Sequence, residues 1–600
     1  MANVLSNPSH VAQIGYNGFD MSNLLKFSST TGELLPVYYD ILYPGDKVTC
    51  STELKTRLMP MEASAMANIE EHIEWFFVPL DQIWSLFSQW YNQINDVSSS
   101  LFDLQNLRSD FPYIDRVAFL QFYKNAFQAQ DMYFRDPDIN GSFTGTSFRL
   151  MELLGIPLQD YSSDEGTSWQ MAINPMFACV YQKIYFDYYR ISDRESNDPE
   201  AYNLDNLSTL DSTPSAALVK KYFTLRYRPR QKDFFTHNYV SPLFGAASLS
   251  SWIPADNVGA TSGLVNAFNQ WLVPTDLAEY AVNYPDNPQS GMSPNASKPT
   301  FVGVASVTTN QKIINGMSPT AIRTAFATQK LLEITRRAGK HIDDQTLAHF
   351  GVKVDRRVSG EVLYLGGSTS TIQIGDVLAT ATTEGSALGQ VGGKGYGFGQ
   401  GKQIHFENDF PCAGVLMAIY SACPAVDYRQ LGLDKLHTYI NLGDFYRPEF
   451  DNLGMQPLFN FQRHAQLWDE AGADNYEVNG WQFRFMESKL KYNRVCGSLA
   501  RTLYYWTTAY NPSHYNTPSN HDAYTQPYYL NYYLCSPFAL NDIMLKAYDF
   551  SGIDNIAPSI TSDSDDLANR YAFDSDPMLH ELYFNVKKAS KMSSFGLEQL

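Results

Sequence analysis

The chain has 600 residues, of which 14% are aromatic and 18% charged, and its 44 basic and 63 acidic side chains give a formal net charge of −19. This excess of acid excludes an overall electrostatic attraction to nucleic acid or to an anionic membrane, so any such contact must be local. Many tyrosines and few charges favour β structure with extensive protein contact surface, because tyrosine buries a large ring and still satisfies one polar end.

The beginning of the chain, MANVLSNPSH, shows no basic stretch followed by an apolar one, and no apolar run of roughly 18 residues appears later. We therefore expect a soluble cytosolic product that does not insert into a membrane. The six cysteines lie far apart without a CxxC pair. We expect buried free thiols, and neither a disulfide framework nor a zinc site.

The first predicted strands flank the turn Pro44-Gly45-Asp46, in which proline presets one backbone angle and glycine accepts left-handed geometry. Residues 47–55 alternate apolar and polar side chains, as a half-buried strand requires. Residues 35–43 are apolar on both faces, which predicts a strand covered on both sides, by its own chain or by another subunit.

A third strand is predicted to end at Pro79, and a short amphipathic helix follows it. Asp81 is a plausible N-cap, and the apolar positions at helical spacing are Ile83, Trp84, Phe87, Trp90 and Ile94. Residues 100–220 then mix short helical patterns with polar loops, which we interpret as long excursions between strands.

Residues 246–318 are rich in Gly, Ala, Ser, Asn and Pro and have weak periodicity, so they predict a large surface loop or an inserted subdomain. The clearest helix covers 319–339, with Ser318 as N-cap, Pro319 at the first helical position and Gly339 at the end. Further apolar runs follow between turns. Many strands joined by long, helix-bearing loops predict an elaborated β-sandwich rather than an alternating βαβ fold.

The glycine-rich stretch GGKGYGFGQGK, residues 392–402, does not fit a phosphate-binding loop, because Tyr396 and Gln403 stand where a glycine and a hydroxyl residue are needed. We interpret it as a flexible loop. The chain contains neither GxSxG nor HExxH, and its histidines show no ligand-like pairing. We therefore predict no catalytic residues, no metal site and no cofactor, although abundant carboxylates leave a glycosidase pair open.

One basic cluster, KKYFTLRYRPRQKDFF, has aromatic residues between its cations. Cations that neutralise phosphates and rings that stack on bases are the two components of single-strand binding. The alternative is a strand whose rings belong to the core and whose cations face solvent or an interface. The candidate DNA-facing residues are Lys220, Lys221, Arg226, Arg228, Arg230, Lys232 and Tyr227.

A second group of cations lies on or just after the predicted helix over 319–339. We interpret it as a solvated face or as compensation of the helix C-terminal charge. Its members are Arg323, Lys330, Arg336, Arg337 and Lys340.

Several segments, in order along the chain, resemble the major capsid protein of the Microviridae, in particular its gokushovirus-like and Bacteroidetes-associated branches. They are FDMSNLLKFSSTTGELLPVYYDILYPGDKV, WFFVPLDQIW, INPMFACVYQKIYFDYYR, TAIRTAFATQKLLEITRRAGKHI with HFGV and YLGGS, and DPMLHELYFNV.

The resemblance implies a single domain over residues 1–600, built on an eight-stranded antiparallel jelly roll with large loop insertions, and a self-assembling subunit of a T=1 shell around circular single-stranded DNA. It implies a threefold protrusion, which we place at 246–318 with 193–218 as the alternative. It also implies internal scaffolding, DNA pilot and small basic DNA-binding proteins as partners, and a host surface receptor for which a glycan is one candidate. By the same resemblance, the protein is made in the cytoplasm of a bacterial host and is located in the virion.

Two other functions stay open from the sequence. A carbohydrate-binding or carbohydrate-active β protein fits the abundant tyrosines, tryptophans and acids, and would remain a small oligomer. A monomeric adhesion or receptor-binding module is the other, and the lack of an export signal argues against both.

Overall fold

The structure is a computed structural model of the chain. It describes residues 15–59, 61, 65–92, 111–115, 118–119, 122, 147–156, 172–207, 215–240, 242, 319–339, 341–354, 360–378, 391–399, 404–429, 431–451, 454–463, 478–509, 533–535, 540, 543 and 576–593.

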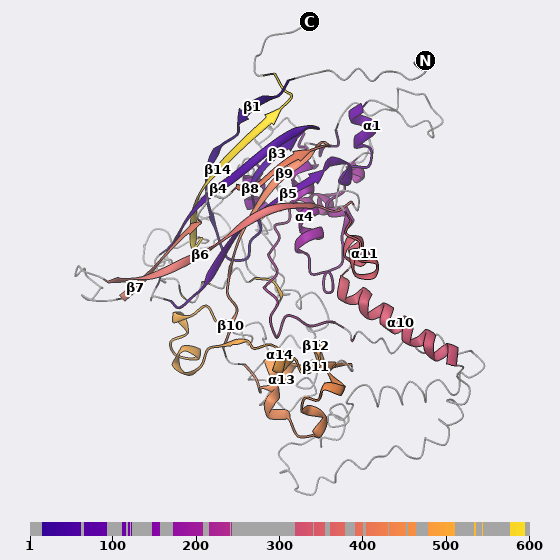
Figure 1. Ribbon diagram of the computed structural model, residues 1–600. Coiled ribbons are helices and arrows are strands. Elements are labelled where there is room, and N and C mark those ends of the chain that lie inside the picture. Colours follow the sequence, from indigo (N-terminus) through magenta and orange to yellow (C-terminus); the bar gives the residue numbers. More distant parts are fainter. Residues whose placement is uncertain are drawn as a thin grey trace.

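The described strands form a mainly antiparallel β structure (Figure 1). They are β1 (Asn17–Asp20), β2 (Asn23–Ser29), β3 (Leu35–Leu42), β4 (Asp46–Leu58), β5 (Ile69–Pro79), β6 (Leu363–Leu378), β7 (Val391–Gly399), β8 (Ile404–Phe410), β9 (Gly414–Pro424), β10 (Asp427–Tyr428), β11 (Met455–Phe459), β12 (Val478–Phe483), β13 (Asn493–Arg494) and β14 (Met578–Ser590).

The described helices lie mostly between β5 and β6 and in a smaller lobe after β9. The α-helices are α1 (Phe87–Asn92), α3 (Ser147–Leu153), α4 (Met176–Ile184), α5 (Ala216–Tyr222), α10 (Pro319–Ala338), α11 (Ile342–Phe350), α13 (Asn460–Arg463) and α14 (Met486–Lys489). A π-helical turn, η3 (Tyr185–Tyr189), continues α4, and short 3-10 turns occur at η1 (Leu80–Gln82), η4 (Pro199–Ala201), η5 (Leu204–Leu207), η8 (Lys435–Thr438), η9 (Leu442–Asp444), η10 (Pro448–Phe450), η13 (Gly497–Ala500) and η14 (Tyr504–Trp506).

The largest sheet follows the order β1-β14-β4-β7-β6-β5-β9-β3, with β2 paired to β14 and β8 paired to β4. The pairs along this path are antiparallel. The long strand β6 pairs with β5 through its first part and with β7 through its last part. It therefore links two halves of the sheet: one contains β1, β2, β14, β4, β8 and β7, and the other contains β5, β9 and β3. The predicted mainly β sandwich is confirmed, while the count of eight strands stays a prediction.

The turn at Pro44-Gly45-Asp46 joins two strands that do not pair with each other: β3 pairs with β9, and β4 pairs with β14, β8 and β7. Gly45 has a φ of 93°, the left-handed region that favours glycine. The Asp46 amide donates to the Tyr43 carbonyl at 3.0 Å and closes the turn. The chain therefore passes from one half of the sheet to the other at this point.

The interior of the sandwich is built around Trp75, which is fully buried on β5. Its ring lies 5.9 Å from Phe584 of β14, 5.5 Å from Phe406 of β8 and 5.2 Å from Tyr38 of β3, measured between ring centroids. Strands from both halves of the sheet thus contribute aromatic rings to one core, as a two-layer sandwich requires.

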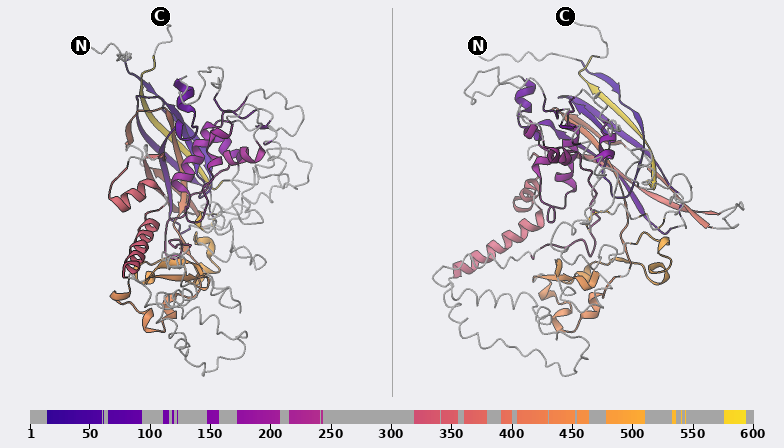
Figure 2. Two further views of the ribbon diagram at one scale, coloured as in Figure 1. Left: turned by 90° about the vertical axis from the view of Figure 1, so that its right-hand side faces the viewer. Right: turned by 180° about the vertical axis from the view of Figure 1, so that it is seen from behind.

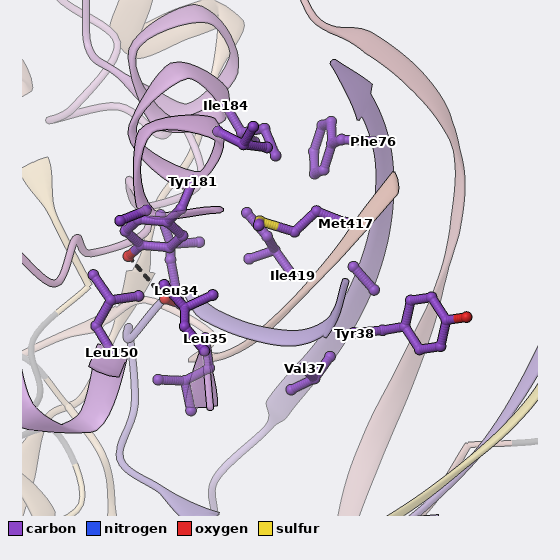
Figure 3. Packing of buried hydrophobic residues seen from close by; sticks show 14 of the residues in the cluster. Leu34, Leu35, Val37, Tyr38, Phe76, Leu150, Tyr181, Ile184, Met417 and Ile419 are labelled. Carbon is purple, nitrogen blue, oxygen red and sulfur yellow. Dashed lines mark hydrogen bonds between the residues drawn. The ribbon is translucent and has the colours of Figure 1, made fainter. Parts of the chain in front are cut away.

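Helix α4 covers the outer face of β3, β5 and β9 (Figure 3). The Tyr181 hydroxyl donates to the Leu34 carbonyl at 2.9 Å, and the buried Ile184 lies on the same helix near Phe76. Tyr38 points to the opposite side of its strand, toward the sandwich interior. The prediction that the strand before Pro44 is covered on both faces is therefore confirmed.

The glycine-rich stretch is a strand in part, which corrects the expectation of a flexible loop. Residues 392–399 belong to β7, while residues 400–402 lie outside the described part of the chain. At Gly397 an added Cβ would stand 2.6 Å from a Glu71 carboxylate oxygen and 3.2 Å from the Thr56 side chain. Glycine here permits a close approach of β7 to its neighbours rather than mobility.

The helix predicted behind Asp81 is shorter than expected. The 3-10 turn η1 contains Asp81 without a side-chain cap, and α1 begins only at Phe87. Ile94 lies outside the described residues. The rings of Trp84, Phe87 and Trp90 still pack together. The apolar spacing therefore predicted an aromatic cluster correctly, whereas Asp81 did not mark the start of a helix.

The cysteines are a further correction, because Cys423 and Cys535 form a disulfide across 112 residues. Backbone hydrogen bonds bring them together: the Cys535 amide donates to the Arg228 carbonyl, and the Gly32 amide donates to the carbonyl of Ala422, next to Cys423. Such a separation leaves no spacing signature in the sequence. Cys50 and Cys179 are buried free thiols as expected, whereas Cys496 is exposed.

The proposed protrusion segment 246–318 lies wholly outside the described residues. In the alternative segment, Leu204 and Leu207 are buried in the main core. Helix α10 occupies Pro319–Ala338, and Gly339 after it has a φ of 97°, in agreement with the predicted boundaries.

Candidate functional site

The basic cluster begins on α5 and continues as an extended segment against the start of β3. Ser215 caps α5, since its side chain accepts a hydrogen bond from the Leu218 amide. Residues 226–230 then run between two other backbones. The Leu34 amide donates to the Arg226 carbonyl, the Arg228 amide to the Gly32 carbonyl, and the Arg230 amide to the Tyr533 carbonyl.

Arg228 is engaged inside the protein. One guanidinium nitrogen lies 2.6 Å from a carboxylate oxygen of Glu74 on β5 and donates to the Ser421 hydroxyl at 2.8 Å. The Tyr189 hydroxyl donates to the same Glu74 carboxylate. Burial and the negative charge of Glu74 raise the pKa of Tyr189 well above its usual value, so it stays a donor.

Arg226 is held by the helix that covers the sheet. Its Nε donates to the side-chain oxygen of Gln182 at 2.8 Å, and its guanidinium lies 3.6 Å from Glu195. The same group stands 4.8 Å from the ring centre of Tyr185 and 4.9 Å from that of Phe186. Arginine suits this place because its planar fork combines hydrogen bonding with ring stacking.

Three more candidates also have contacts within the protein. Arg230 is buried and donates from Nε to the Leu534 carbonyl at 2.8 Å, and Tyr227 is buried in the core. Lys221 lies 2.9 Å from Asp198 and 2.7 Å from Glu200.

Lys220 and Lys232 are the exposed members of the basic cluster. The rings between the cations are buried, namely Tyr222, Phe223, Tyr227, Phe234 and Phe235. The structure thus brings the candidates onto one segment and turns most of them inward, and DNA contact stays a prediction that rests on the exposed lysines.

The second group of cations lies on α10. Arg323, Lys330 and Arg337 are exposed there. The Arg336 side chain and Lys340 lie outside the described part of the chain.

A polar cluster that sequence reasoning missed lies inside the sandwich, where Glu71 of β5 and His580 of β14 are both fully buried and 3.6 Å apart. The Tyr420 hydroxyl donates to Glu71 at 2.8 Å, and the Thr56 hydroxyl donates to the same carboxylate oxygen. Thr56 also contacts Nδ1 of His580 at 2.9 Å, and Ser29 contacts Nε2 at 2.7 Å. Since Thr56 has one hydroxyl hydrogen, Nδ1 carries the imidazole proton and Ser29 donates to Nε2.

Burial controls the charge of this cluster. It raises the pKa of Glu71, against the hydrogen bonds from Thr56, Tyr420 and Ser370. It lowers the pKa of His580 to about 3, with a further lowering from Arg149 and an opposing effect from Asp576. His580 is therefore a neutral imidazole at neutral pH, and it joins strands of both halves of the sheet.

Arg149 of α3 lies beside this cluster and links the segment before β3 to the segment before β14. It lies 2.7 Å from Glu33 and 2.7 Å from Asp576, just before β14. The ion pairs are partly to fully buried, with side-chain exposures of 17%, 0% and 4% for Arg149, Glu33 and Asp576. Such buried pairs fix geometry, because removing one partner leaves an uncompensated charge.

The family model of a capsid protein (F protein) matches residues 9–144 and 158–523 of the chain. The chain belongs to this capsid protein family. The capsid protein VP1 of Chlamydia phage 1 is 22% identical over 537 residues, covering 81% of this chain and 84% of the relative. The capsid protein VP1 of Bdellovibrio phage phiMH2K is 23% identical over 521 residues, covering 83% of this chain and 85% of the relative.

This membership confirms the resemblance to the Microviridae capsid protein that the sequence segments indicated. Most of those segments are structural elements of the fold: the first runs from the end of β1 to the start of β4, the third contains α4, and the last begins β14. Among the described residues, no cluster of His, Cys, Asp and Glu side chains has the arrangement of a metal site. No helix in that same part of the capsid protein is long and apolar enough to span a membrane.

Proposed function

We propose that this capsid protein assembles with copies of itself into a T=1 icosahedral shell that encloses a circular single-stranded DNA genome. Membership of the capsid family carries the proposal and makes the chain a virion component with a structural role. The function we propose is assembly, without catalysis. We further propose that surface loops contribute to host attachment, with a glycan as one candidate receptor.

The composition supports repeated contact between copies. Few charges and many aromatic residues suit a surface that is buried against several neighbours, and obligate contacts of this kind typically bury more than roughly 2,000 Å². A net charge of −19 opposes enclosure of DNA unless cations neutralise the phosphates. A small basic DNA-binding protein is one source of such cations. An internal scaffolding protein and a DNA pilot protein complete the proposed set of partners.

Assembly is tested by electron microscopy and sedimentation of the purified chain near neutral pH, with and without single-stranded DNA and with a scaffolding partner of the same phage. We expect closed isometric shells of uniform size. Persistent small oligomers under all these conditions, together with glycan binding, would instead favour the carbohydrate-binding alternative.

We propose that Lys220 and Lys232 face the interior and contact DNA. Replacing both with alanine should lower the DNA content of the particles and weaken the salt dependence of DNA binding, because each phosphate contact releases a counterion. Shell yield should stay near that of the unmodified chain, because both side chains are exposed. The ratio of absorbance at 260 and 280 nm of purified particles measures the DNA content.

The matched control for these lysines is Lys491→Ala, at another exposed lysine. Equal DNA loss in the control would mean that overall charge, rather than these two positions, sets the packaged amount. A collapse of shell yield in the double variant would assign the lysines to a subunit contact.

A further inference from the structure

The smaller lobe, which contains β10 to β13, lies beyond one end of the sandwich (Figures 1 and 2). Among the described residues it has a hydrophobic core of its own, formed by Phe234, Phe235, Tyr428, Leu458, Met486 and Tyr533. The chain enters the lobe directly after β9, and residues 533–535 lie beside residues 228–230. We call the place where these two segments meet the end of β9 the neck.

The disulfide between Cys423 and Cys535 lies in the neck. The Cys535 amide donates to the Arg228 carbonyl at 2.8 Å, and the Gly32 amide donates to the Ala422 carbonyl at 2.7 Å. Gly32 has a φ of 81°, and an added Cβ there would stand 2.8 Å from Cβ of Cys535. The backbone of the sandwich thus brings the Cα atoms of the two cysteines to 6.3 Å, within the usual range for a disulfide.

The neck disulfide closes a loop that contains the described strands and helices of the lobe. Its two cysteines are 112 residues apart, and β10 to β13 lie between them. In the chain-entropy model a disulfide stabilises more when the loop is longer, because it removes more freedom from the open chain. With the bond formed, the two ends of the lobe cannot separate when the hydrogen bonds of the neck open.

A phage capsid protein passes through two redox environments. It is synthesised in the bacterial cytoplasm, where thiols are kept reduced, and the virion leaves for surroundings in which disulfides persist. We propose that Cys423 and Cys535 remain thiols while the subunit is made and assembled, and that they join after release and fix the lobe to the sandwich in the virion. The inference rests on the proposed function, because release of the virion supplies the change of environment.

The oxidant is a low-molecular-weight disulfide. Cys423 is half-buried and Cys535 is only 4% exposed, so Cys423 is the thiol that a small disulfide reaches. The Cys423 thiolate attacks one sulfur of the small disulfide and releases the first small thiolate. The Cys535 thiolate then attacks the Cys423 sulfur and releases the second. The two protein thiols lose two electrons and two protons, and the small disulfide gains them as two thiols.

Alkylation of thiols tests the timing. Cells that produce the chain are lysed directly into N-ethylmaleimide under denaturing conditions, and the peptides are identified by mass spectrometry. Cys423 and Cys535 should both carry maleimide in this lysate. After the native chain is incubated with oxidised glutathione, their two peptides should be joined by a disulfide. A pair already joined in the fresh lysate, or still unjoined after oxidation, would overturn the inference.

Two variants test the order of the exchange. Cys535→Ser should accumulate glutathione on Cys423, because the second thiolate is missing. The matched control is Cys496→Ser, which removes an exposed free thiol and should form the joined peptides at the rate of the unmodified chain. A Cys535→Ser chain that takes up no glutathione on Cys423 would contradict the proposed route.

Hydrogen–deuterium exchange of the unassembled chain measures the effect on the neck. The amides of Arg230 and Cys535 donate across the neck to the carbonyls of Tyr533 and Arg228. Their exchange should be about tenfold or more slower in the oxidised chain than in the same chain treated with dithiothreitol, because the disulfide restricts opening of the neck. No substitution is needed for this comparison. Equal rates in the two states would overturn the inference.

Two controls locate the effect. Exchange in β14 should be the same in both redox states, and equal slowing there would show that the disulfide stabilises the whole fold rather than the neck, which also overturns the inference. In Cys535→Ser, the Arg230 amide should exchange at one rate with and without dithiothreitol.

The outcomes separate this inference from the proposed function. Failure of the unmodified chain to form shells counts against the proposed function, while alkylation in the lysate and exchange in the unassembled chain still decide the role of the disulfide. Normal shells from a chain whose neck amides do not respond to oxidation leave the shell function standing and overturn the inference.

Discussion

Replacing Arg228 with methionine is expected to lower the free energy of unfolding of the subunit by about 3–5 kcal/mol, because it leaves Glu74 as an uncompensated, largely buried carboxylate. The side chains of Arg228 and Glu74 are only 17% and 11% exposed. Methionine keeps much of the volume against Tyr189 while it removes the charge. Urea unfolding of the unassembled chain, followed by tryptophan fluorescence, measures the loss as a lower midpoint at an unchanged slope.

The matched control removes both charges. The double variant Arg228→Met and Glu74→Met should recover most of the lost stability, since a buried ion pair replaced by apolar groups of similar volume is often close to neutral. An unchanged midpoint in the single variant, together with a loss of packaged DNA, would contradict the internal role and return Arg228 to the DNA-facing residues.

Local sequence patterns predicted those parts of the fold that local chemistry determines. The turn at Pro44-Gly45-Asp46, the strand ending at Pro79 and the helix between Ser318 and Gly339 depend on residues a few positions apart. The prediction of Asp81 as an N-cap was wrong because a contact outside this local stretch determines the structure here. The chain after Pro79 packs on the core as a 3-10 turn with buried Leu80, and this tertiary packing outweighed the local capping preference.

The basic cluster shows why a site is harder to predict than a strand. A run of cations and rings in sequence does not say which charges have partners elsewhere, and the partner of Arg228 is Glu74, more than a hundred residues away. The disulfide between Cys423 and Cys535 was missed for the same reason, because only the fold brings β9 next to residue 535. Residues that meet only through long-range contacts have no fixed spacing in the sequence, so no sequence motif identifies them.

The buried cluster did leave a signal that the sequence reading passed over. Alternation along β5 places Glu71 on the same face as Ile69, Ile73 and Trp75, and alternation along β14 places His580 with Leu582 on the buried face. A titratable residue at an inward position of a strand needs a partner inside the sandwich. Two such positions on different strands therefore predict a pair.

The buried pair of Glu71 and His580 makes the free energy of unfolding of the subunit depend on pH. The pKa of His580 falls from 6.5 to about 3 on folding. Below pH 6.5 the His580 imidazole therefore binds a proton in the unfolded chain but not in the folded chain. The free energy of unfolding consequently decreases as the pH falls. Glu71 has the opposite sign, because burial raises its pKa above 4.5. Its favourable contribution is complete below pH 4.5 and is lost as the pH rises through the folded value.

Replacing His580 with glutamine should make the subunit less sensitive to acid, since the amide can still bond Thr56 and Ser29 but does not titrate. As the pH falls from 6.5 to 5, the free energy of unfolding of the unmodified chain should fall more steeply than that of the variant, and the difference in slope should approach about 1.4 kcal/mol per pH unit near pH 5. Urea unfolding at closely spaced pH values measures both slopes, and His437→Gln, at an exposed position, controls for the loss of an imidazole. Equal slopes for the unmodified chain and the His580 variant would show that His580 is protonated inside the folded sandwich, with Glu71 as the facing carboxylate that holds the charge.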